Sequence, residues 1–306
     1  PAGNLATAAV GSYTITPSAL TLSTGSTGNY SITYTNGTLT VSPATLTITA
    51  DNQNKDYGAA LPTLTVSYSC LVNGDVAPAT APTISTTATA SSPVGPYPIT
   101  ATGAADPNYT ISYVGGTLTV DAVPLTITAN DQSKCAGQLF NFTGNEFIAI
   151  GLANGDVAGD ITVTLTSNGS LASATAGQYT IVPDNATGSA VDNYNITYIN
   201  GTFTVNPHPT AEISGTTAIC NGGSTDLTLA VTGSGTISGT LSDGTSFSGT
   251  APFITVTVTP TTTTTYTVAA LTDADCAATA SDLTGSAEVT VNNDATITLS
   301  SPVGTN

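Results

Sequence analysis

Large apolar residues alternate with polar residues along much of the chain. Between Asn108 and Tyr113, the bulky residues Tyr109, Ile111 and Tyr113 alternate with residues that carry amide or hydroxyl groups. A period of two puts the bulky side chains on one face of a β-strand and the polar side chains on the other. The bulky face is expected to lie in a core. Because similar alternation recurs throughout, the chain is predicted to be all-β.

This strand motif occurs three times. Each copy reads Asn-Tyr-x-Ile-x-Tyr, then two further residues, then Gly-Thr-x-Thr-Val, and the copies occupy residues 29–41, 108–120 and 193–205. The first tyrosines of successive copies are 79 and 85 residues apart. A repeat of about 80 residues has the size of a small β-sandwich. The sequence therefore predicts tandem immunoglobulin-like modules.

Prolines mark the ends of the repeats. Pro43, Pro124 and the segment 207–209 follow the last strand of a unit, and proline restricts the backbone to extended conformations. We therefore expect short, stiff linkers and an extended rod. The predicted modules are a partial one at 1–43, complete ones at 44–122 and 123–206, one of a different type at 207–293, and the start of a further one at 294–306.

A pair of turn residues separates the two runs within each copy of the motif. The pairs are Asn36-Gly37, Gly115-Gly116 and Asn200-Gly201. Such pairs favour the type I′ turn, in which both central residues have positive φ. Each unit is therefore predicted to end in a β-hairpin.

The composition excludes some classes of partner and location. The 306 residues include 19 acidic residues and two cationic ones, for a net charge of −17, and only 7% are charged. A surface of this sign repels a phosphate backbone, so nucleic acid is excluded as a partner. The sequence contains no apolar run of the roughly 20 residues that a membrane-spanning helix needs. No membrane span is therefore expected in this region.

The residue types that carry catalysis are scarce. The single histidine, His208, lies between two prolines in a linker, so neither a Ser-His-Asp arrangement nor a multi-histidine metal site is expected. Most aspartates fall in turns, where solvent keeps them ionised. The chain is predicted not to be an enzyme and to need no cofactor. Asp273 and Asp275 are candidate ligands for Ca²⁺, although their spacing matches no EF-hand loop.

The chain has four cysteines. Cys220 and Cys276 lie in the same predicted module, so we predict that they form a disulfide, which implies an oxidising, extracellular compartment. Cys70 and Cys135 occupy non-equivalent positions in different modules and are not expected to pair with each other. Either they are buried free thiols or they form a bridge between molecules.

The two lysines occupy equivalent positions in successive repeats. Lys55 and Lys134 each precede a turn glycine, Gly58 and Gly137 respectively. The first interpretation is that each lysine stabilises its turn. The alternative is a lysine–asparagine isopeptide crosslink, which requires a buried acidic residue beside the lysine.

Several segments resemble the MBG ("mostly bacterial immunoglobulin-like") repeat, also called the YDG repeat. They are residues 55–58, 71–75, 108–118 and 125–134, and the resemblance extends over about 1–206. The third unit departs from the family pattern, because Lys134-Cys135-Ala136-Gly137 stands where the family has Lys-x-Tyr-Gly. The segment 207–293 resembles the threonine-rich immunoglobulin- or PKD-like modules that accompany such repeats.

The resemblance implies a place in large secreted surface proteins, often of Bacteroidetes-type bacteria and exported by the type IX system, where such arrays look like adhesin stalks. It carries over no catalytic residues. We therefore expect a structural and adhesive stalk or fibre at the cell surface. Its expected partners are other modules of the chain, neighbouring copies, or a surface glycan or protein. One alternative is a self-associating filament or sheath subunit, and another is a carbohydrate-binding region of a secreted enzyme, which requires an exposed aromatic platform.

Overall fold

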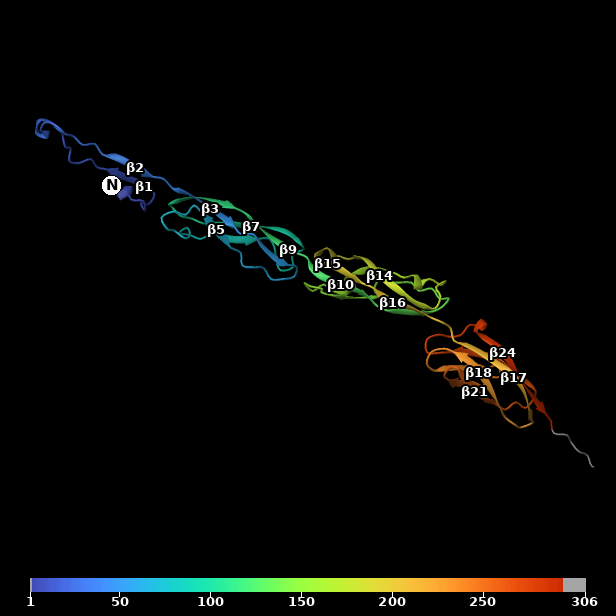
Figure 1. The fold of residues 1–306 in the computed structure, drawn as a ribbon. Coiled ribbons are helices and arrows are strands. Elements are labelled where there is room, and N and C mark those ends of the chain that lie inside the picture. Colours follow the sequence, from blue (N-terminus) through green and yellow to red (C-terminus); the bar gives the residue numbers. More distant parts are fainter. Residues whose placement is uncertain (1, 294–306) are drawn as a thin grey trace, which may run out of the picture. The chain divides into compact units, whose positions relative to one another are not determined.

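The computed structural model describes residues 2–293, and β-strands dominate it (Figure 1). The remaining regular elements are short 3₁₀ segments, so the prediction of an all-β chain is confirmed. No helix in residues 2–293 is long and apolar enough to cross a bilayer. The predicted first strand of a further module, at 294–306, lies outside the described residues.

The described residues divide into two compact units. The first contains the residues up to Leu125 together with Ile150–Ile161 and Gly188–Thr197, and the second contains Thr126–Ala149, Thr162–Thr187 and the residues from Tyr198 onward. Three strands, β10, β12 and β15, have residues in both units. The module boundaries drawn from the sequence remain a prediction. We keep the ranges as names: second module for 44–122, third module for 123–206 and fourth module for 207–293.

The second module is a sandwich of two sheets within the first unit. One sheet has the order β5-β3-β8 and the other β4-β9-β7-β6, and the pairs β3/β8 and β4/β9 are parallel. Leu46 and Ile48 of β3 are fully buried, because they alternate with threonines that face outward. The elements of the first unit are η1 Ala2–Asn4, β1 Gly11–Ile15, η2 Thr27–Asn29, β2 Gly37–Val41, β3 Ala44–Ala50, β4 Gln53–Asp56, β5 Val66–Ser69, β6 Thr83–Thr86, β7 Gly95–Thr102, β8 Tyr109–Val114 and β9 Gly116–Asp121.

The predicted terminal hairpin is wrong. β8 and β9 lie in different sheets, and neither Gly115 nor Gly116 has positive φ. The chain instead crosses from one sheet to the other, and a Cβ on Gly116 would lie 2.4 Å from the carbonyl oxygen of Ala50. In the third module β16 likewise pairs with β11 and β14, and a Cβ on Gly201 would lie 2.6 Å from the Ala129 oxygen. These glycines are needed because two backbones approach closely.

The predicted apolar stripe of the motif is only partly buried. Tyr109 is 6% exposed and packs in a core cluster with Leu46 and Ile48, as predicted. Tyr113, however, is 39% exposed, so its predicted core position is wrong. Its hydroxyl accepts a hydrogen bond from the backbone N–H of Ala104 at 2.8 Å. The far end of the strand thus extends past the core, and the tyrosine packs over a neighbouring loop.

The third module repeats the larger sheet of the second. In the second unit the strands have the order β11-β16-β14-β13, with β11 and β16 parallel, as β4 and β9 are. The elements are β10 Val123–Ala129, β11 Gln132–Cys135, β12 Phe147–Ile150, η3 Ala158–Asp160, β13 Thr162–Thr166, η4 Asn168–Ser170, β14 Gly177–Thr187, η5 Val191–Asn193, β15 Tyr194–Ile199 and β16 Gly201–Asn206.

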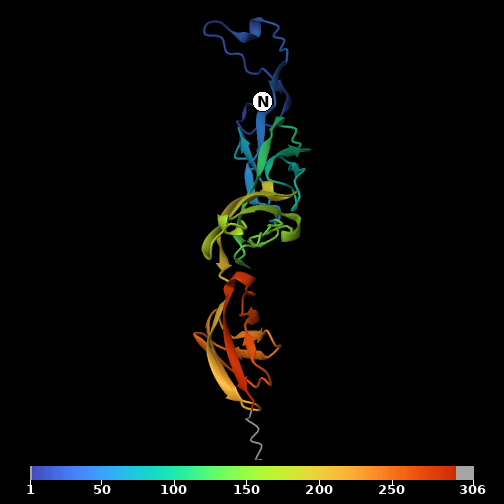
Figure 2. The same cartoon turned by 90° about the vertical axis from the view of Figure 1, so that its right-hand side faces the viewer.

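The fourth module, also in the second unit, is a different sandwich. Its sheets have the orders β21-β18-β17-β24-β22 and β20-β19-β23, and Figure 2 shows the long parallel pair β17 and β24. Ile213, Leu229 and Tyr266 lie in the core between the sheets. The elements are β17 Thr210–Cys220, β18 Thr225–Thr232, β19 Ile237–Leu241, β20 Ser246–Gly249, β21 Phe253–Val258, β22 Thr264–Tyr266, β23 Val268–Thr272, η6 Ala280–Asp282 and β24 Leu283–Asn292.

Candidate functional site: the joint around His208

Only three residues connect the third module to the fourth. β16 ends at Asn206 and β17 begins at Thr210, so the linker is Pro207-His208-Pro209. The two prolines restrict its backbone and donate no hydrogen bonds. Among the three linker residues, His208 is therefore the one whose side chain can form polar contacts with both flanking modules.

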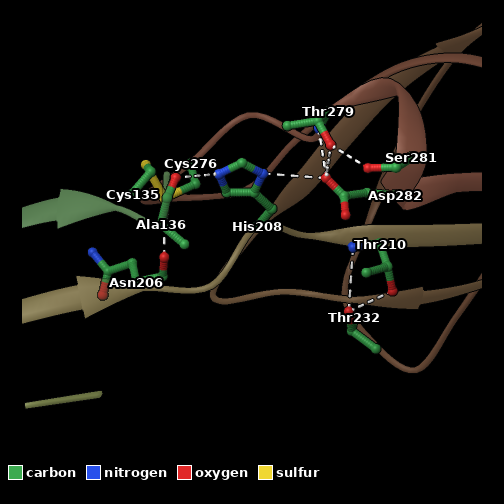
Figure 3. A network of polar contacts seen from close by, with 10 residues as sticks. All are labelled: Cys135, Ala136, Asn206, His208, Thr210, Thr232, Cys276, Thr279, Ser281 and Asp282. Atoms are coloured by element: carbon green, nitrogen blue, oxygen red, sulfur yellow. Dashed lines mark hydrogen bonds and ion pairs between the residues drawn. A yellow bond between two sulfur atoms is a disulfide. The ribbon is translucent and has the colours of Figure 1, made fainter. Parts of the chain in front are cut away.

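Each ring nitrogen of His208 faces an oxygen (Figure 3). Nε2 lies 2.9 Å from the carbonyl oxygen of Ala136 in the third module, and Nδ1 lies 3.2 Å from Oδ2 of Asp282 in the fourth. A carbonyl and an ionised carboxylate both only accept hydrogen bonds. A ring that carries hydrogen on both nitrogens therefore satisfies both modules at once, and that ring is a cation facing an anion.

Asp282 is held in place by its own loop. Its carboxylate accepts hydrogen bonds from the hydroxyl of Thr279 at 2.5 Å and from the backbone N–H of Thr279 at 2.7 Å, which forms a capping box around η6. The side-chain and backbone bonds from Thr279, followed by His208, lower the pKa of Asp282 below its usual value. The carboxylate therefore stays ionised and correctly placed for His208.

A disulfide crosslinks the same joint. Cys135, at the end of β11 in the third module, is bonded to Cys276 in the fourth, and their Cα atoms are 5.8 Å apart. The next residue after Cys135 is Ala136, whose carbonyl accepts the hydrogen bond from His208. A covalent bond and a histidine bridge, which lie close together at the joint, thus link the two modules (Figure 3).

The predicted disulfide between Cys220 and Cys276 is wrong. Cys276 lies beside the linker, whereas Cys220 ends β17, which starts at the linker and runs away from it for eleven residues. At about 3.3 Å per residue, this strand carries Cys220 more than 30 Å from the joint. Cys220 and Cys70 are both exposed and unpaired, so Cys70 is not the buried thiol of the first alternative. Both alternatives are wrong for Cys135, because it is bonded to a cysteine of the same chain.

The candidate calcium ligands lie in the loop that carries Cys276. The carboxylate of Asp273 accepts backbone hydrogen bonds from Ser234, Asp275 and Cys276 at 2.7–2.9 Å. Burial raises the pKa of Asp273, but these bonds outweigh it, so the pKa lies below its ordinary value. Asp275 accepts a bond from the Ser234 hydroxyl. No group of three or more metal-ligating side chains is present within residues 2–293. The geometry gives Asp273 a role in shaping the loop, and calcium binding remains a prediction.

The joint between the second and third modules, within the first unit, uses the equivalent loop without a covalent bond. Tyr57 follows Lys55-Asp56, as Ala136 follows Lys134-Cys135. Its hydroxyl donates to Asp156 at 3.2 Å and accepts from the Asn154 side chain at 3.0 Å. The loop after the lysine is thus the part of a repeat that contacts the next module in both joints.

Asp156 also binds a tyrosine of its own module. Tyr194, from the third copy of the strand motif, donates to Asp156 at 2.5 Å and stacks edge-on against Tyr57 at 5.7 Å between ring centroids. Burial, followed by the hydrogen bond to Asp156, raises the pKa of Tyr194 to about 12. The turn that contains Asp156 therefore joins two tyrosines from successive modules.

A second contact recurs at two joints of the first unit. The side-chain oxygen of Asn193 accepts the backbone N–H of Val94 at 2.9 Å, and that of Asn108 accepts the N–H of Val10 at 3.0 Å. These asparagines open the second and third copies of the strand motif. The asparagine recurs in every copy of the motif, but nothing in the sequence indicates that it contacts the preceding module.

The two lysines stabilise their loops, as the first interpretation predicted. Nζ of Lys55 donates to the carbonyl oxygens of Asp56, Ala59 and Ala90 at 3.0–3.1 Å, and Nζ of Lys134 donates to Gln138 and Leu171. Burial lowers the pKa of Lys134. No carboxylate within the described part of the chain forms an ion pair with either lysine, so the condition for an isopeptide crosslink is not met.

Trypsin is expected to leave the folded protein essentially uncut. Lys55 and Lys134 are the chain's only cleavage sites, and they are 6% and 7% exposed. After denaturation and reduction, the same protease should cut after both and give three fragments, which mass spectrometry would identify. Appearance of these fragments at a similar rate from the folded protein would contradict the buried lysine positions.

The chain was compared with protein families, with curated proteins and with solved structures. The family model of the MBG domain (YGX type) matches residues 3–40, 46–119 and 125–204. Comparison with curated proteins gives no match. Among solved structures, the I9–I11 tandem of titin is similar at 14% identity and a TM-score of 0.32, over 81% of this chain and all of that one.

A variant of titin domains I67–I69 is similar at 12% identity and a TM-score of 0.29, over 82% of this chain and 97% of that one. Both TM-scores are too low to support an argument about this chain. The all-β architecture follows from its own strands and sheets.

Proposed function

Because the chain belongs to the MBG domain family, we propose that it is a non-catalytic structural region, a series of joined β-sandwich modules that serves as a stalk or fibre of a bacterial surface protein. The repeated modules account for the structural role. The adhesive role rests on the resemblance to MBG repeats. In this proposal, the binding function belongs to the surface protein as a whole, and the modules supply its stalk. Export by the type IX system belongs to the same proposal.

The crosslinked joint is the observation that best supports this proposal. A covalent bond between Cys135 and Cys276, together with the two-sided contacts of His208, resists separation of adjacent modules. A spacer under tension needs this property. Disulfides persist in oxidising environments, which supports an extracellular location.

The side chains at the joint are engaged in structural contacts. Both nitrogens of His208 face partners in the flanking modules, and the Asp282 carboxylate is bound by Thr279. Neither group is therefore available as a general base. This supports the assignment to a structural rather than a catalytic class.

Electron microscopy of the isolated protein would test the proposal against the filament alternative. A stalk is expected to give single beaded threads at all protein concentrations. Ordered lateral arrays, with bundle width growing with concentration, would contradict it and favour a filament or sheath subunit. Carrying out the same experiment with and without calcium would also test the prediction for Asp273 and Asp275.

A further inference from the structure

A shallow groove crosses the outer face of the larger sheet of the fourth module. The register places Thr284, Glu212, Ala230 and Phe253 in one row over the adjacent strands β24, β17, β18 and β21. All four side chains are exposed, whereas the residues that alternate with them point into the module. The pocket around this row has a volume of about 490 Å³.

The groove has an aromatic wall and an acidic wall. Phe253 is 64% exposed, and Glu212 lies two strands away, about 10 Å at the usual strand spacing. Ala230, between them, is too small to fill the gap and forms the floor. A side chain from outside can therefore contact the phenyl ring and the carboxylate at the same time.

The charge of the groove is acidic. Glu212 forms no ion pair among residues 2–293, so its negative charge faces the groove unpaired, whereas the second carboxylate of the lining, Asp282, already faces His208 at 3.2 Å. No lysine or arginine lines the pocket. Phenylalanine has no hydroxyl or N–H to offer a sugar, but its ring face attracts a cation.

We propose that this groove docks a basic polypeptide segment, with an arginine or lysine side chain between Phe253 and Glu212. A guanidinium fits both walls, because its plane stacks on an aromatic ring and its N–H groups pair with a carboxylate. The partner is not a second copy of this chain. The chain has no arginine, and its two lysines, Lys55 and Lys134, are buried and donate to backbone carbonyls. The site adds a specific interaction to the proposed structural role and does not depend on it.

The test uses a blocked pentapeptide of alternating glycine and arginine, titrated into the ¹⁵N-labelled protein and followed by NMR. Shifts are expected at the amides of β17, β18 and β21 around the groove, and added salt should weaken binding. Phe253→Ala and Glu212→Gln should each weaken binding about two- to fivefold. Both positions are exposed, so both variants should fold, and thermal unfolding would verify this.

Asp226→Asn is the matched control. Asp226 is exposed on β18 four residues from Ala230, so its substitution removes the same charge at the same sheet but outside the groove. It should bind the peptide like the unmodified protein. Equal weakening by Asp226→Asn and Glu212→Gln would overturn the proposal in favour of general charge attraction. Binding of neutral oligosaccharides but not of the peptide would overturn it in favour of a glycan site.

Discussion

Reducing the Cys135–Cys276 disulfide is expected to lengthen the chain substantially when it is pulled from its two ends until the modules unfold. The bonded cysteines are 141 residues apart in sequence. At about 3.4 Å for each extended residue, the gain in contour length is roughly 480 Å. With the bond intact, the tension passes from Cys135 directly to Cys276, and the residues between them cannot be stretched.

Single-molecule force spectroscopy would measure this gain as longer or additional unfolding steps under reducing conditions. The residues released include most of the third module and of the fourth, up to β23. Cys135→Ser should show the gain without reductant. Cys70→Ser and Cys220→Ser are matched controls, because these cysteines are unpaired, and should behave like the unmodified protein. An unchanged contour length after reduction would refute the assigned pairing.

The disulfide should also stabilise the second unit against denaturant. In the chain-entropy model, closing a loop of this length removes up to about 5 kcal/mol of unfolded-state entropy. The loop includes parts of both modules, so reduction should destabilise the third module as well as the fourth. A disulfide inside the fourth module alone would have left the third unaffected.

Replacing Gly116 by alanine is expected to cost the second module roughly 3 kcal/mol or more. The new Cβ would lie 2.4 Å from the carbonyl oxygen of Ala50 and 3.0 Å from its carbonyl carbon, and both belong to a buried strand end that cannot easily move. Gly201→Ala meets the equivalent contact with Ala129 at 2.6 Å. Its effect should be nearly as large.

Gly37→Ala is the matched control, because Gly37 holds the same place in the first copy of the motif. There the nearest atom to a new Cβ is in Ile15 at 3.6 Å, an ordinary contact, so the cost should stay below about 1 kcal/mol. Hydrogen exchange read by mass spectrometry would measure each module separately in the intact chain. Equal costs for Gly37→Ala and Gly116→Ala would contradict the role assigned to the close approach.

The strands and the repeat could be predicted from the sequence, because alternation and spacing are local properties. Leu46 and Ile48 alternate with threonines, and both are buried as that pattern indicates. Which strands share a sheet is not local. The pair Gly115-Gly116 is typical of a hairpin, yet the chain crosses between sheets there. A glycine that permits positive φ and a glycine that permits close approach look identical in sequence.

The prediction of the cysteine pairing was wrong for a similar reason. Shared membership of a module favoured Cys220 with Cys276, but the direction of β17 carries Cys220 away from the joint. One signal was present in the sequence. The third repeat has Cys135-Ala136 where the second has Asp56-Tyr57, so the loss of the tyrosine coincides with the gain of a cysteine. If this departure is interpreted as the replacement of a tyrosine contact by a disulfide, it predicts that Cys135 is bonded to the next module.

In the loop after the lysine, the contact with the next module can therefore change while the fold of the repeat stays the same. Its backbone is the same in both repeats, since Tyr57 and Ala136 each donate an N–H to the last residue of β9 or β16 at 2.9 Å and Gly58 and Gly137 share a φ of 78°. Two side chains of the loop, together with the group that they meet in the next module, determine whether that module is held by reversible hydrogen bonds or by a covalent bond. Selection can thus adjust how readily each joint yields, one boundary at a time, without redesigning any sandwich.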